Sequence, residues 1–500
     1  MNYRIVLKNI GLFTSAFSLL LIPSALWAVW YREWDSLLAF AESIAVGMTV
    51  GLLAMLAGRG ASSARMFQRE TLGVVGLGWL AAAQVGALPF FFSGTLGPID
   101  SFFESMSGLT TTGATVITGI ESTDKSVLFW RSFTHWIGGI GIVVLFLAVL
   151  PYLGAGGKQL FKSEAPGPDP HGLSPRIKDT ASVLWKLYLG LTVSQTLLLM
   201  AAGMTFYDAL CHTFGTIATG GFSTKQNSIA HFDSFAIEMI VLVFMVMAGT
   251  NFALYFSMFR GNRAAVFRDR EWRIYIGIMA LATVCIAVNL MGLRFTSTID
   301  ETPIELHNEE EAFPPARAFR SAAFMVVSIT TTTGYGLDNF ERWPYFSQMV
   351  LAGLMFVGGC AGSTGGGVKV IRVIILLKMV YWRLENTFRP KTVRPLRVGE
   401  QIIDADMQRR VSTFLLLHLL ILGVGSIFMS GMGVPPLTAI TSVIATLNNI
   451  GPGLEFVGPA HDFSLIPGPG KVVMCFLMAA GRLEIFAILV LFVPAFWKHS

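Results

Sequence analysis

The chain has 500 residues, of which 53% are hydrophobic and 13% are charged, and its mean hydropathy is +0.62. Soluble domains carry roughly a quarter charged residues. The composition therefore excludes an ordinary soluble domain and predicts a protein that crosses a membrane several times. The net charge of +5 calls for no nucleic-acid partner, because cytoplasmic loops of membrane proteins are enriched in Lys and Arg. The four cysteines are scattered and have no metal-ligand spacing, which argues against a disulfide or zinc role.

Ten apolar segments are long enough to cross a membrane, which takes about 20 residues per helix. The loops at 59–70, 156–178, 260–273 and 378–410 together hold twenty Lys and Arg residues. Short basic loops stay in the cytoplasm, so we expect these loops and both termini to face inward. In chain order, the expected spans are 9–30, 37–58, 71–92, 127–153, 180–204, 234–259, 273–293, 346–378, 411–432 and 468–496.

Four shorter, half-polar segments lie between these spans and recur in a regular way. They are too short to cross a membrane, and each is followed by a glycine turn and another long span. The aligned glycines are 108, 113 and 117 residues apart, at Gly113, Gly221, Gly334 and Gly451. Thirteen residues before the glycines stand Asp100, Asp208, Ser321 and Thr438, all good helix N-cap residues. Each unit therefore predicts a span, a short re-entrant helix, a glycine turn and a second span.

The predicted fold class is an all-α polytopic membrane protein. It has four helix–pore-loop–helix repeats arranged with pseudo-fourfold symmetry around one pore, plus two extra N-terminal helices. Non-helical backbone at membrane depth is tolerated where it lines a cavity or is buried in protein, so four such turns predict a common axis. The expected units are the helix pair 1–62 and the repeats 63–160, 161–265, 266–395 (with a broken helix and gating loop) and 396–500.

The turns contain hydroxyls, amides and glycines but no carboxylate. Rings of backbone carbonyls can replace the hydration shell of a cation, and glycine permits the backbone angles this requires. A divalent ion usually recruits carboxylates, so a monovalent ion is the better match. Small residues also serve as packing motifs between membrane helices, an alternative that four copies in register disfavour. The candidate filter residues are Thr110, Thr111, Thr112, Gly113, Ala218, Thr219, Gly220, Gly221, Thr331, Thr332, Thr333, Gly334, Asn448, Asn449, Ile450 and Gly451.

A glycine-rich stretch, "GGCAGSTGGG" at 358–367, interrupts the expected span 346–378. Each glycine costs about 1 kcal/mol relative to alanine inside a helix, so the stretch predicts an unwound loop just inside the filter that serves as a gate. A phosphate-binding loop is disfavoured because the Gly-Lys-Ser/Thr order is missing, while a passive kink for close packing stays open. The candidate gate residues are Gly358, Gly359, Gly362, Ser363, Thr364, Gly365, Gly366, Gly367 and Arg482.

Arg482 joins this set because it lies in the last span, where a charge costs roughly 2.5–3.5 kcal/mol. It follows its own filter glycine by about the same distance as the loop follows Gly334. We expect it to bond freed loop carbonyls and to repel cations while the gate is closed; a structural pair with Glu484 or with another helix is the alternative. The remaining polar residues near the spans are expected to be inward-facing anchors (Lys369, Arg372) or packed polar residues (His135, His212, His418).

Six motifs carry a resemblance to a known family: "GLTTTGA", "ATGGFST", "TTTGYG", "NNIGPG", "FVGGCAGSTGGGVKVIRV" at 356–373 and "GRLEIF" at 481–486. The chain resembles the TrkH/TrkG/KtrB superfamily of potassium-uptake proteins over nearly its whole length, and its extra N-terminal helix pair resembles the TrkH branch. In related eukaryotic transporters a serine at the first filter glycine accompanies sodium transport, so Gly113 favours potassium.

The resemblance implies a homodimer in the bacterial inner membrane, each subunit with its own pore, and a cytoplasmic nucleotide-binding regulatory ring (TrkA-like). It implies K⁺ as the transported ion and no organic cofactor. The implied K⁺ positions are Thr111, Thr112, Thr219, Gly220, Thr332, Thr333, Asn449 and Ile450.

Two other function classes are alternatives to an ion-conducting protein. Broken helices also build the midplane sites of alternating-access carriers, so a cation symporter coupled to Na⁺ or H⁺ is the alternative. Carriers of that kind show inverted repeats, whereas these four repeats enter from the same side. An intramembrane enzyme ranks last, because the spans offer no Ser/His, paired Asp or HExxH arrangement. We therefore expect no enzymatic activity.

Overall fold

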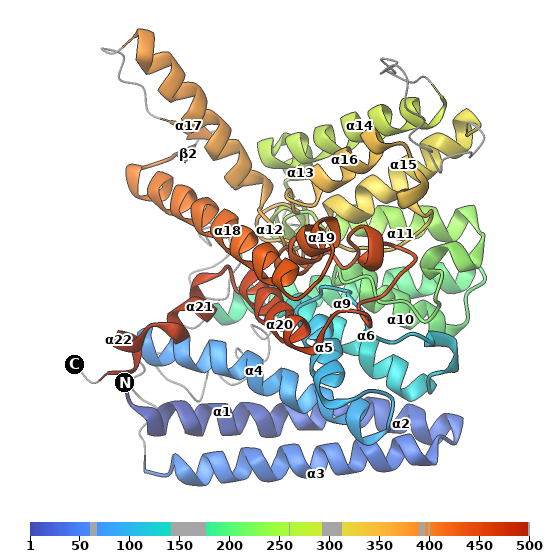
Figure 1. The fold of residues 1–500 in the computed structure, drawn as a ribbon, viewed down its shortest axis with the longest axis vertical. Helices are drawn as coiled ribbons and strands as arrows, with labels where there is room; N and C mark the ends of the chain where they lie inside the picture. Colours follow the sequence, from blue (N-terminus) through green and yellow to red (C-terminus); the bar gives the residue numbers. More distant parts are fainter. Residues whose placement is uncertain are drawn as a thin grey trace.

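Helices make up nearly all the regular structure of the computed structural model, which describes residues 1–60, 68–141, 177–259, 261–292, 313–389, 396–398 and 401–498. The strands in these ranges are β1 (Arg397–Val398) and β2 (Gln401–Ile402), which form one small antiparallel hairpin. The two ends of the chain lie close together at one side of the molecule (Figure 1).

The N-terminal helices form an antiparallel pair outside the repeats. The first arm comprises α1 (Tyr3–Ser18), η1 (Leu19–Leu21) and α2 (Ile22–Tyr31), and the second is α3 (Trp34–Ala57). Small residues let the arms approach closely: a Cβ on Gly51 would overlap Ser15, and one on Gly11 would overlap the backbone at Gly51. Such contacts are the usual basis of helix packing in a bilayer.

The first two repeats follow the predicted order of a long helix, a short helix, a turn and a second helix, although the second helix is shorter than a full span. Repeat 1 comprises α4 (Gln68–Phe92), α5 (Pro98–Leu109), η2 (Ile120–Ser122) and α6 (Lys125–Ile140). Repeat 2 comprises α9 (Ile177–Ala201), α10 (Phe206–Ile217), η4 (Ser228–Phe232), α11 (Phe235–Ala248) and α12 (Phe252–Phe259), and α13 (Ala265–Arg268) follows it.

The other two repeats have the same order. Repeat 3 comprises α14 (Arg270–Leu290), α15 (Pro315–Thr330), η5 (Phe340–Arg342), α16 (Tyr345–Leu354) and α17 (Val370–Phe388). Repeat 4 comprises α18 (Ala405–Gly431), α19 (Pro436–Leu447), η6 (Glu455–Val457), α20 (Gly468–Arg482), α21 (Phe486–Leu489), η7 (Val490–Phe492) and α22 (Pro494–Trp497). Helices α17 and α18 project from one side of the molecule (Figure 1).

The starts of the short helices were predicted wrongly. The N-caps are Gly97, Thr205, Pro314 and Pro435. Asp100, Asp208 and Thr438 lie instead in the first helical turn, and Ser321 lies further inside α15. Proline is favoured at the first position of a helix, and three of these helices have it at their beginning, which starts each helix earlier than a side-chain cap would. Only in α10 does the side chain of the N-cap, Thr205, accept a bond from Asp208 N.

Fewer unbroken spans are present than the ten predicted. In the described ranges, six helices are long and apolar enough to cross a membrane, or seven if α11 and α12, bent by 93°, count as one. The expected spans 346–378 and 468–496 are each divided by a break, after Leu354 and Arg482. The expected span 127–153 runs beyond Gly141 into residues outside the described ranges. The second span of several repeats is therefore interrupted, not that of repeat 3 alone.

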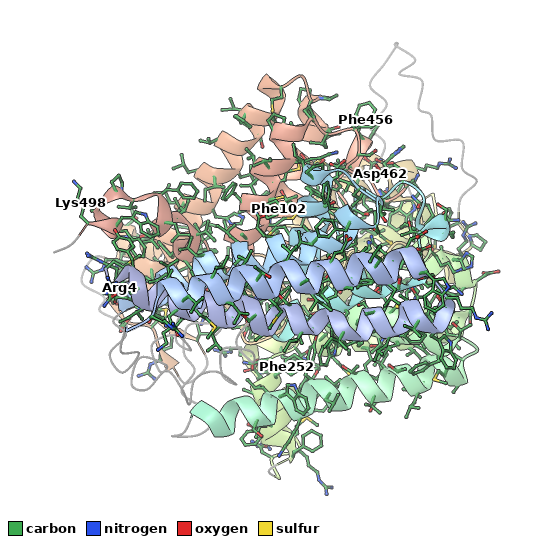
Figure 2. The ribbon with its side chains drawn as sticks, turned by 90° about the horizontal axis from the view of Figure 1, so that it is seen from below. Arg4, Phe102, Phe252, Phe456, Asp462 and Lys498 are labelled. Atoms are coloured by element: carbon green, nitrogen blue, oxygen red, sulfur yellow. The ribbon has the colours of Figure 1, made fainter. Side chains whose placement is uncertain are left out.

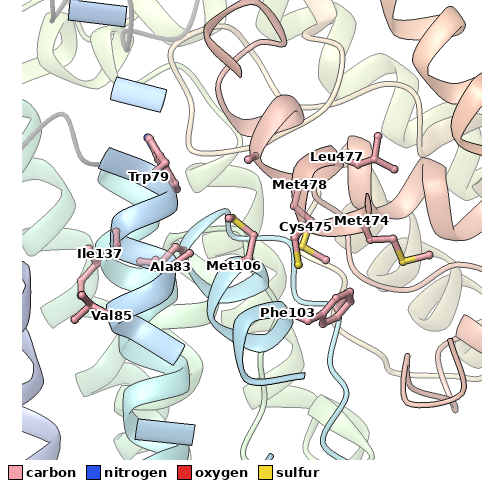
Figure 3. Packing of buried hydrophobic residues seen from close by; sticks show 14 of the residues in the cluster. Trp79, Ala83, Val85, Phe103, Met106, Ile137, Met474, Cys475, Leu477 and Met478 are labelled. Atoms are coloured by element: carbon pink, nitrogen blue, oxygen red, sulfur yellow. The ribbon is translucent and has the colours of Figure 1, made fainter. Parts of the chain in front are cut away.

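The core joins the first and last repeats. In Figure 3, Phe103 and Met106 of α5 lie between α4, which carries Trp79, and α20, which carries Cys475 and Met478. All five side chains are almost wholly buried. This packing places the short helix of repeat 1 beside the second span of repeat 4, as a closed arrangement of four repeats requires. Figure 2 shows the loop that carries Phe456 and Asp462 on the side away from Arg4 and Lys498.

Candidate functional site

Each short helix ends in a turn with the same unusual backbone. The second turn residue and the glycine both have a positive φ, a conformation that costs most L-residues roughly 1–2 kcal/mol and that glycine adopts freely. The same alternation in four separate segments shows that one local structure is built four times. The φ values are 52° and 81° for Thr111 and Gly113, 55° and 80° for Thr219 and Gly221, 60° and 78° for Thr332 and Gly334, and 54° and 100° for Asn449 and Gly451.

The residue before each glycine ties its turn back to the short helix. Its N–H donates to a helix carbonyl five residues earlier, which leaves its own carbonyl directed away from that bond. The four bonds are Thr112 N to Ser107 O (2.9 Å), Gly220 N to Gly215 O (2.8 Å), Thr333 N to Ser328 O (2.9 Å) and Ile450 N to Ala445 O (2.9 Å).

The four turns form a closed ring in chain order. A Cβ added to any of the four glycines would overlap or crowd a carbonyl oxygen of the next turn, so no side chain fits at any of them. The carbonyl always belongs to the residue just before the next glycine, and the last pair joins repeat 4 back to repeat 1. The pairs are Gly113 with Gly220 O, Gly221 with Thr333 O, Gly334 with Ile450 O and Gly451 with Thr112 O.

Polar side chains of three turns form hydrogen bonds within their own repeat. In repeat 1 the Thr110 and Thr112 hydroxyls bond each other at 2.8 Å, and in repeat 3 Thr331 and Thr333 do the same at 2.8 Å. In repeat 4, Asn448 Nδ2 instead donates to the carbonyl of Ile444 at 3.0 Å. In the part of the chain that the structure describes, no cluster of His, Cys, Asp and Glu could hold a metal ion. The groups of the ring are thus neutral oxygens, which suit a monovalent cation.

A buried ion pair that the sequence analysis missed supports the first turn. Glu104 of α5 accepts hydrogen bonds from Thr115 Oγ1 and Val116 N, both at 2.9 Å, and pairs with Arg131 of α6 at 2.6 Å. Arg131 also donates to the carbonyl of Ser223, beyond the second turn, at 2.9 Å. An acid inside a short helix and an arginine inside an apolar span were the signals in the sequence.

The glycine-rich loop between α16 and α17 lies directly against the helix ends behind the ring. Gly366 N donates to Thr332 Oγ1 at 2.7 Å, and the Thr364 hydroxyl donates to the carbonyl of Ile217 at 3.0 Å. A Cβ on Gly366 would crowd the carbonyl of Asn448. The loop therefore contacts the C-terminal ends of α10 and α19 as well as the turn that follows α15.

Arg482, the last residue of α20, contacts this loop with its side chain. Its guanidinium donates to Thr364 O at 2.7 Å and to the carbonyls of Gly138 and Gly139 at the end of α6. Glu484, the expected alternative partner, pairs with Arg372 at 2.5 Å. One cation thus connects the end of α20 with the loop of repeat 3 and the end of α6.

Two further charged groups bind the loop. Glu271, at the start of α14, accepts from Ala361 N at 2.8 Å and from Ile371 N at 3.0 Å, so one carboxylate holds both sides of the loop. Lys369 donates to the carbonyl of Gly365 and is only 5% exposed. The prediction that Lys369 is an inward-facing anchor is therefore wrong, because the ammonium is turned back to satisfy a loop carbonyl. Glu271 was missed; its signal was an acid at the beginning of an apolar span.

The loops on the other side of the ring also connect successive repeats. Glu341, in η5, lies 3.9 Å from His461 of repeat 4. Burial raises the pKa of the Glu341 carboxyl above its ordinary value. The other connections are Gln226 N to Glu121 Oε1 (2.8 Å), Gly336 N to Ser228 Oγ (3.2 Å) and Phe463 N to Thr115 O (2.8 Å).

A multi-pass helical protein whose four turns close into a ring of neutral oxygens falls in the class of ion-transport proteins. The family model of the TrkH cation transport proteins matches residues 41–499, and the chain belongs to that family. Family membership confirms that the chain is a transport protein rather than an enzyme, and that the TrkH branch is the right one.

Similar proteins cover the whole chain. It is 39% identical to the Trk system potassium uptake protein TrkH of Salmonella typhimurium strain LT2, over 100% of both chains, and 31% identical to TrkG of Escherichia coli K12, over 99% of both. The crystal structure of the potassium transporter TrkH from Vibrio parahaemolyticus superposes with a TM-score of 0.85 at 35% identity, covering 100% of both chains. This similarity confirms the predicted all-α membrane fold.

Proposed function

We propose that the chain takes up potassium ions through the ring of four turns, which serves as a carbonyl-lined selectivity filter. The observation that carries the proposal is the closed ring in which each glycine faces the carbonyl of the next turn. Carbonyl oxygens held in such a ring replace the water around a monovalent cation. The potassium uptake proteins named above, which match along the full chain, support the same ion. The ion positions we propose are those at Thr111, Thr112, Thr219, Gly220, Thr332, Thr333, Asn449 and Ile450.

We further propose that the loop 358–367 and Arg482 form the gate. The loop lies against the C-terminal ends of the short helices, where the helix dipoles attract a cation. Its contacts with Thr332 and Ile217 are single hydrogen bonds, which a moving loop can break and remake. The positive charge of Arg482 beside Thr364 opposes the passage of cations while the loop is in this position.

The assembly belongs to the same proposal. We propose a homodimer in the bacterial inner membrane with both termini in the cytoplasm and a cytoplasmic nucleotide-binding ring on the basic loops. The basic loops, above all 378–410, offer such a ring a positive docking face. We propose that the helix pair spans 1–62 and the four repeats span 63–160, 161–265, 266–395 and 396–500.

An alternating-access symporter is the weaker candidate. Such carriers are built from inverted repeats around a midplane site. Here the four turns have one backbone conformation and follow one another in one direction around the ring. A continuous axial path fits this arrangement better than two opposed halves.

The test is a Gly113→Ser variant, assayed for rubidium and sodium flux in vesicles. The added side chain meets the carbonyl of Gly220, so we expect the rubidium-to-sodium ratio to fall severalfold. Gly433→Ser is the matched control, because Gly433 also has a positive φ, 85°, but no atom would crowd its Cβ within 4 Å. An unchanged ratio in the Gly113 variant would show that the ring is not the selectivity filter.

A further inference from the structure

Repeat 2 differs from repeats 1 and 3 in the composition of its turn, as does repeat 4, where Asn448 bonds the carbonyl of Ile444 instead. Repeats 1 and 3 carry threonines at the first and third turn positions, and their hydroxyls bond each other at 2.8 Å. Repeat 2 has Ala218 and Gly220 at these positions, so it has no such hydroxyl pair. The backbone does not explain Gly220, because its φ, unlike that of Gly221, is outside the positive range. Something other than backbone conformation must therefore require a glycine there.

The imidazole of His135 occupies the space beside Gly220. A Cβ on Gly220 would lie 2.5 Å from Nδ1 and 2.6 Å from Cγ of His135. The imidazole is fully buried, stacks on the Phe222 ring at 4.0 Å with a 12° interplanar angle, and accepts a hydrogen bond from Phe222 N at 3.4 Å. A backbone N–H can only donate, so Nδ1 is the acceptor of this bond. One side chain thus contacts the turn on both sides of Gly221.

His135 belongs to a face of α6 that is shaped to fit the first two turns. Gly138 and Gly139 follow at the i+3 and i+4 positions, which share a helix face with His135. A Cβ on Gly138 would overlap the carbonyl of Leu109, and one on Gly139 would overlap Ala218. The small residues of the second turn and those of α6 therefore complement each other.

We propose that His135 is the positioning residue of the second filter segment and replaces the threonine pair that braces repeats 1 and 3. It does not contact the ion; it holds the segment 219–222 so that the carbonyls of that segment keep their place in the ring. The inference depends on the proposed function, because its effect is on ion selectivity. His135 was expected to be an ordinary packed polar residue; the stacking and the fit to Gly220 give it this more specific role.

The test compares rubidium-to-sodium flux ratios in vesicles for His135→Phe and His135→Gln. Phenylalanine keeps the stack but cannot accept from Phe222 N, so the segment loses one support and we expect the ratio to fall severalfold. Glutamine can accept, and we expect it to retain more of the ratio. Trp136→Phe is the matched control, because Trp136 bonds Thr192 of α9 and should leave the ratio unchanged. A wild-type ratio in His135→Phe would overturn the inference.

A second pair of variants tests the fit itself. Gly220→Thr alone should lose selectivity because its Cβ meets the imidazole, and adding His135→Ala should restore part of it. If the double variant is no better than Gly220→Thr, His135 is not what excludes a side chain. The same comparison decides the question if His135→Phe does not fold. Gly113→Ser separates the two proposals: if it leaves the ratio unchanged, the filter proposal fails; if it lowers the ratio while His135→Phe does not, only this inference fails.

Discussion

Arg482 shows how one side chain can hold a set of broken helices together. Its donors reach the carbonyl of Thr364 in repeat 3 and those of Gly138 and Gly139 in repeat 1. Carbonyls at interrupted helix ends lack their normal partners, and a planar guanidinium presents five donors to satisfy several at once. Lysine, with one nitrogen, is a poor substitute for this geometry.

Replacing Arg482 by alanine should raise cation flux and leave the rubidium-to-sodium ratio unchanged. The reason is that the guanidinium contacts the loop and not the ring of four turns. Vesicle flux of the two ions measures both quantities. Arg372→Ala is the control: it removes a nearby cation whose partner is Glu484. Flux at or below the parental level in a well-folded Arg482→Ala protein would make Arg482 a structural charge only.

The Glu104–Arg131 pair makes a prediction about stability. Both side chains are at most 2% exposed, and removing one member of a buried pair costs about 3–5 kcal/mol because the other charge is left without compensation. We therefore expect Glu104→Gln to lower the free energy of unfolding by that amount, measured by denaturant unfolding in detergent. Asp406→Asn, in a largely exposed pair with Arg410, should cost less than about 1 kcal/mol. Equal losses in both variants would contradict this view of the pair.

At the scale of elements, the loop 358–367 is attached at several separate points. The Glu271 carboxylate accepts hydrogen bonds from backbone N–H groups on both sides of the loop. Lys369 and Arg482 donate hydrogen bonds to loop carbonyls. Gly366 N donates to the Thr332 hydroxyl. These polar contacts hold a segment that has no helix to stabilise it. The loop can leave the ring only if several of them are exchanged together, which suits a two-state gate.

Deleting several of residues 360–366 should therefore raise flux without changing selectivity. The deletion removes the segment that lies against Ile217 and Asn448 but leaves all four turns intact. Single-channel recording or vesicle flux gives the measurement, and a deletion of similar length in the loop at 59–64, far from the ring in sequence, is the control. Reduced flux with normal folding would show that the loop is a passive kink.

Some helices and turns could be predicted from the sequence, and others could not. The re-entrant helices and their turns were predictable, because short apolar length and a glycine in register are local properties. The helix starts were not, because Pro98 and Pro315 begin their helices ahead of the residues that seemed suited to cap them. The break between α11 and α12 was missed because a close tertiary contact accompanies it: Gly249, at the end of α11, fits against Tyr275.

The site shows the same division. The four turns and Arg482 were identified from motif and composition. Glu104, Arg131 and Glu271 were not, because their roles depend on partners 11 to 100 residues away. Pairing at that distance is set by how the repeats pack and is not visible in any single stretch of the chain.

For the whole molecule, regulation is expected to come from another protein. The regular elements of the described residues are helices and a single hairpin of two short strands. Within these residues there is no parallel sheet of the kind that binds nucleotides. ATP or NADH should therefore leave the flux of the purified chain unchanged, and a response should appear only when a nucleotide-binding partner is added. A nucleotide effect on the chain alone, measured in the same vesicles, would contradict this.

The contact between Gly451 and the carbonyl of Thr112 has a consequence for biosynthesis. Three contacts of the ring join neighbouring repeats, but this one joins the first turn to be translated with the last. At the usual rates of elongation the two emerge from the ribosome on the order of tens of seconds apart. A nascent chain in the membrane has no complete ring during that interval. The ring therefore closes only when translation is almost finished, and a product truncated before Gly451 lacks this contact.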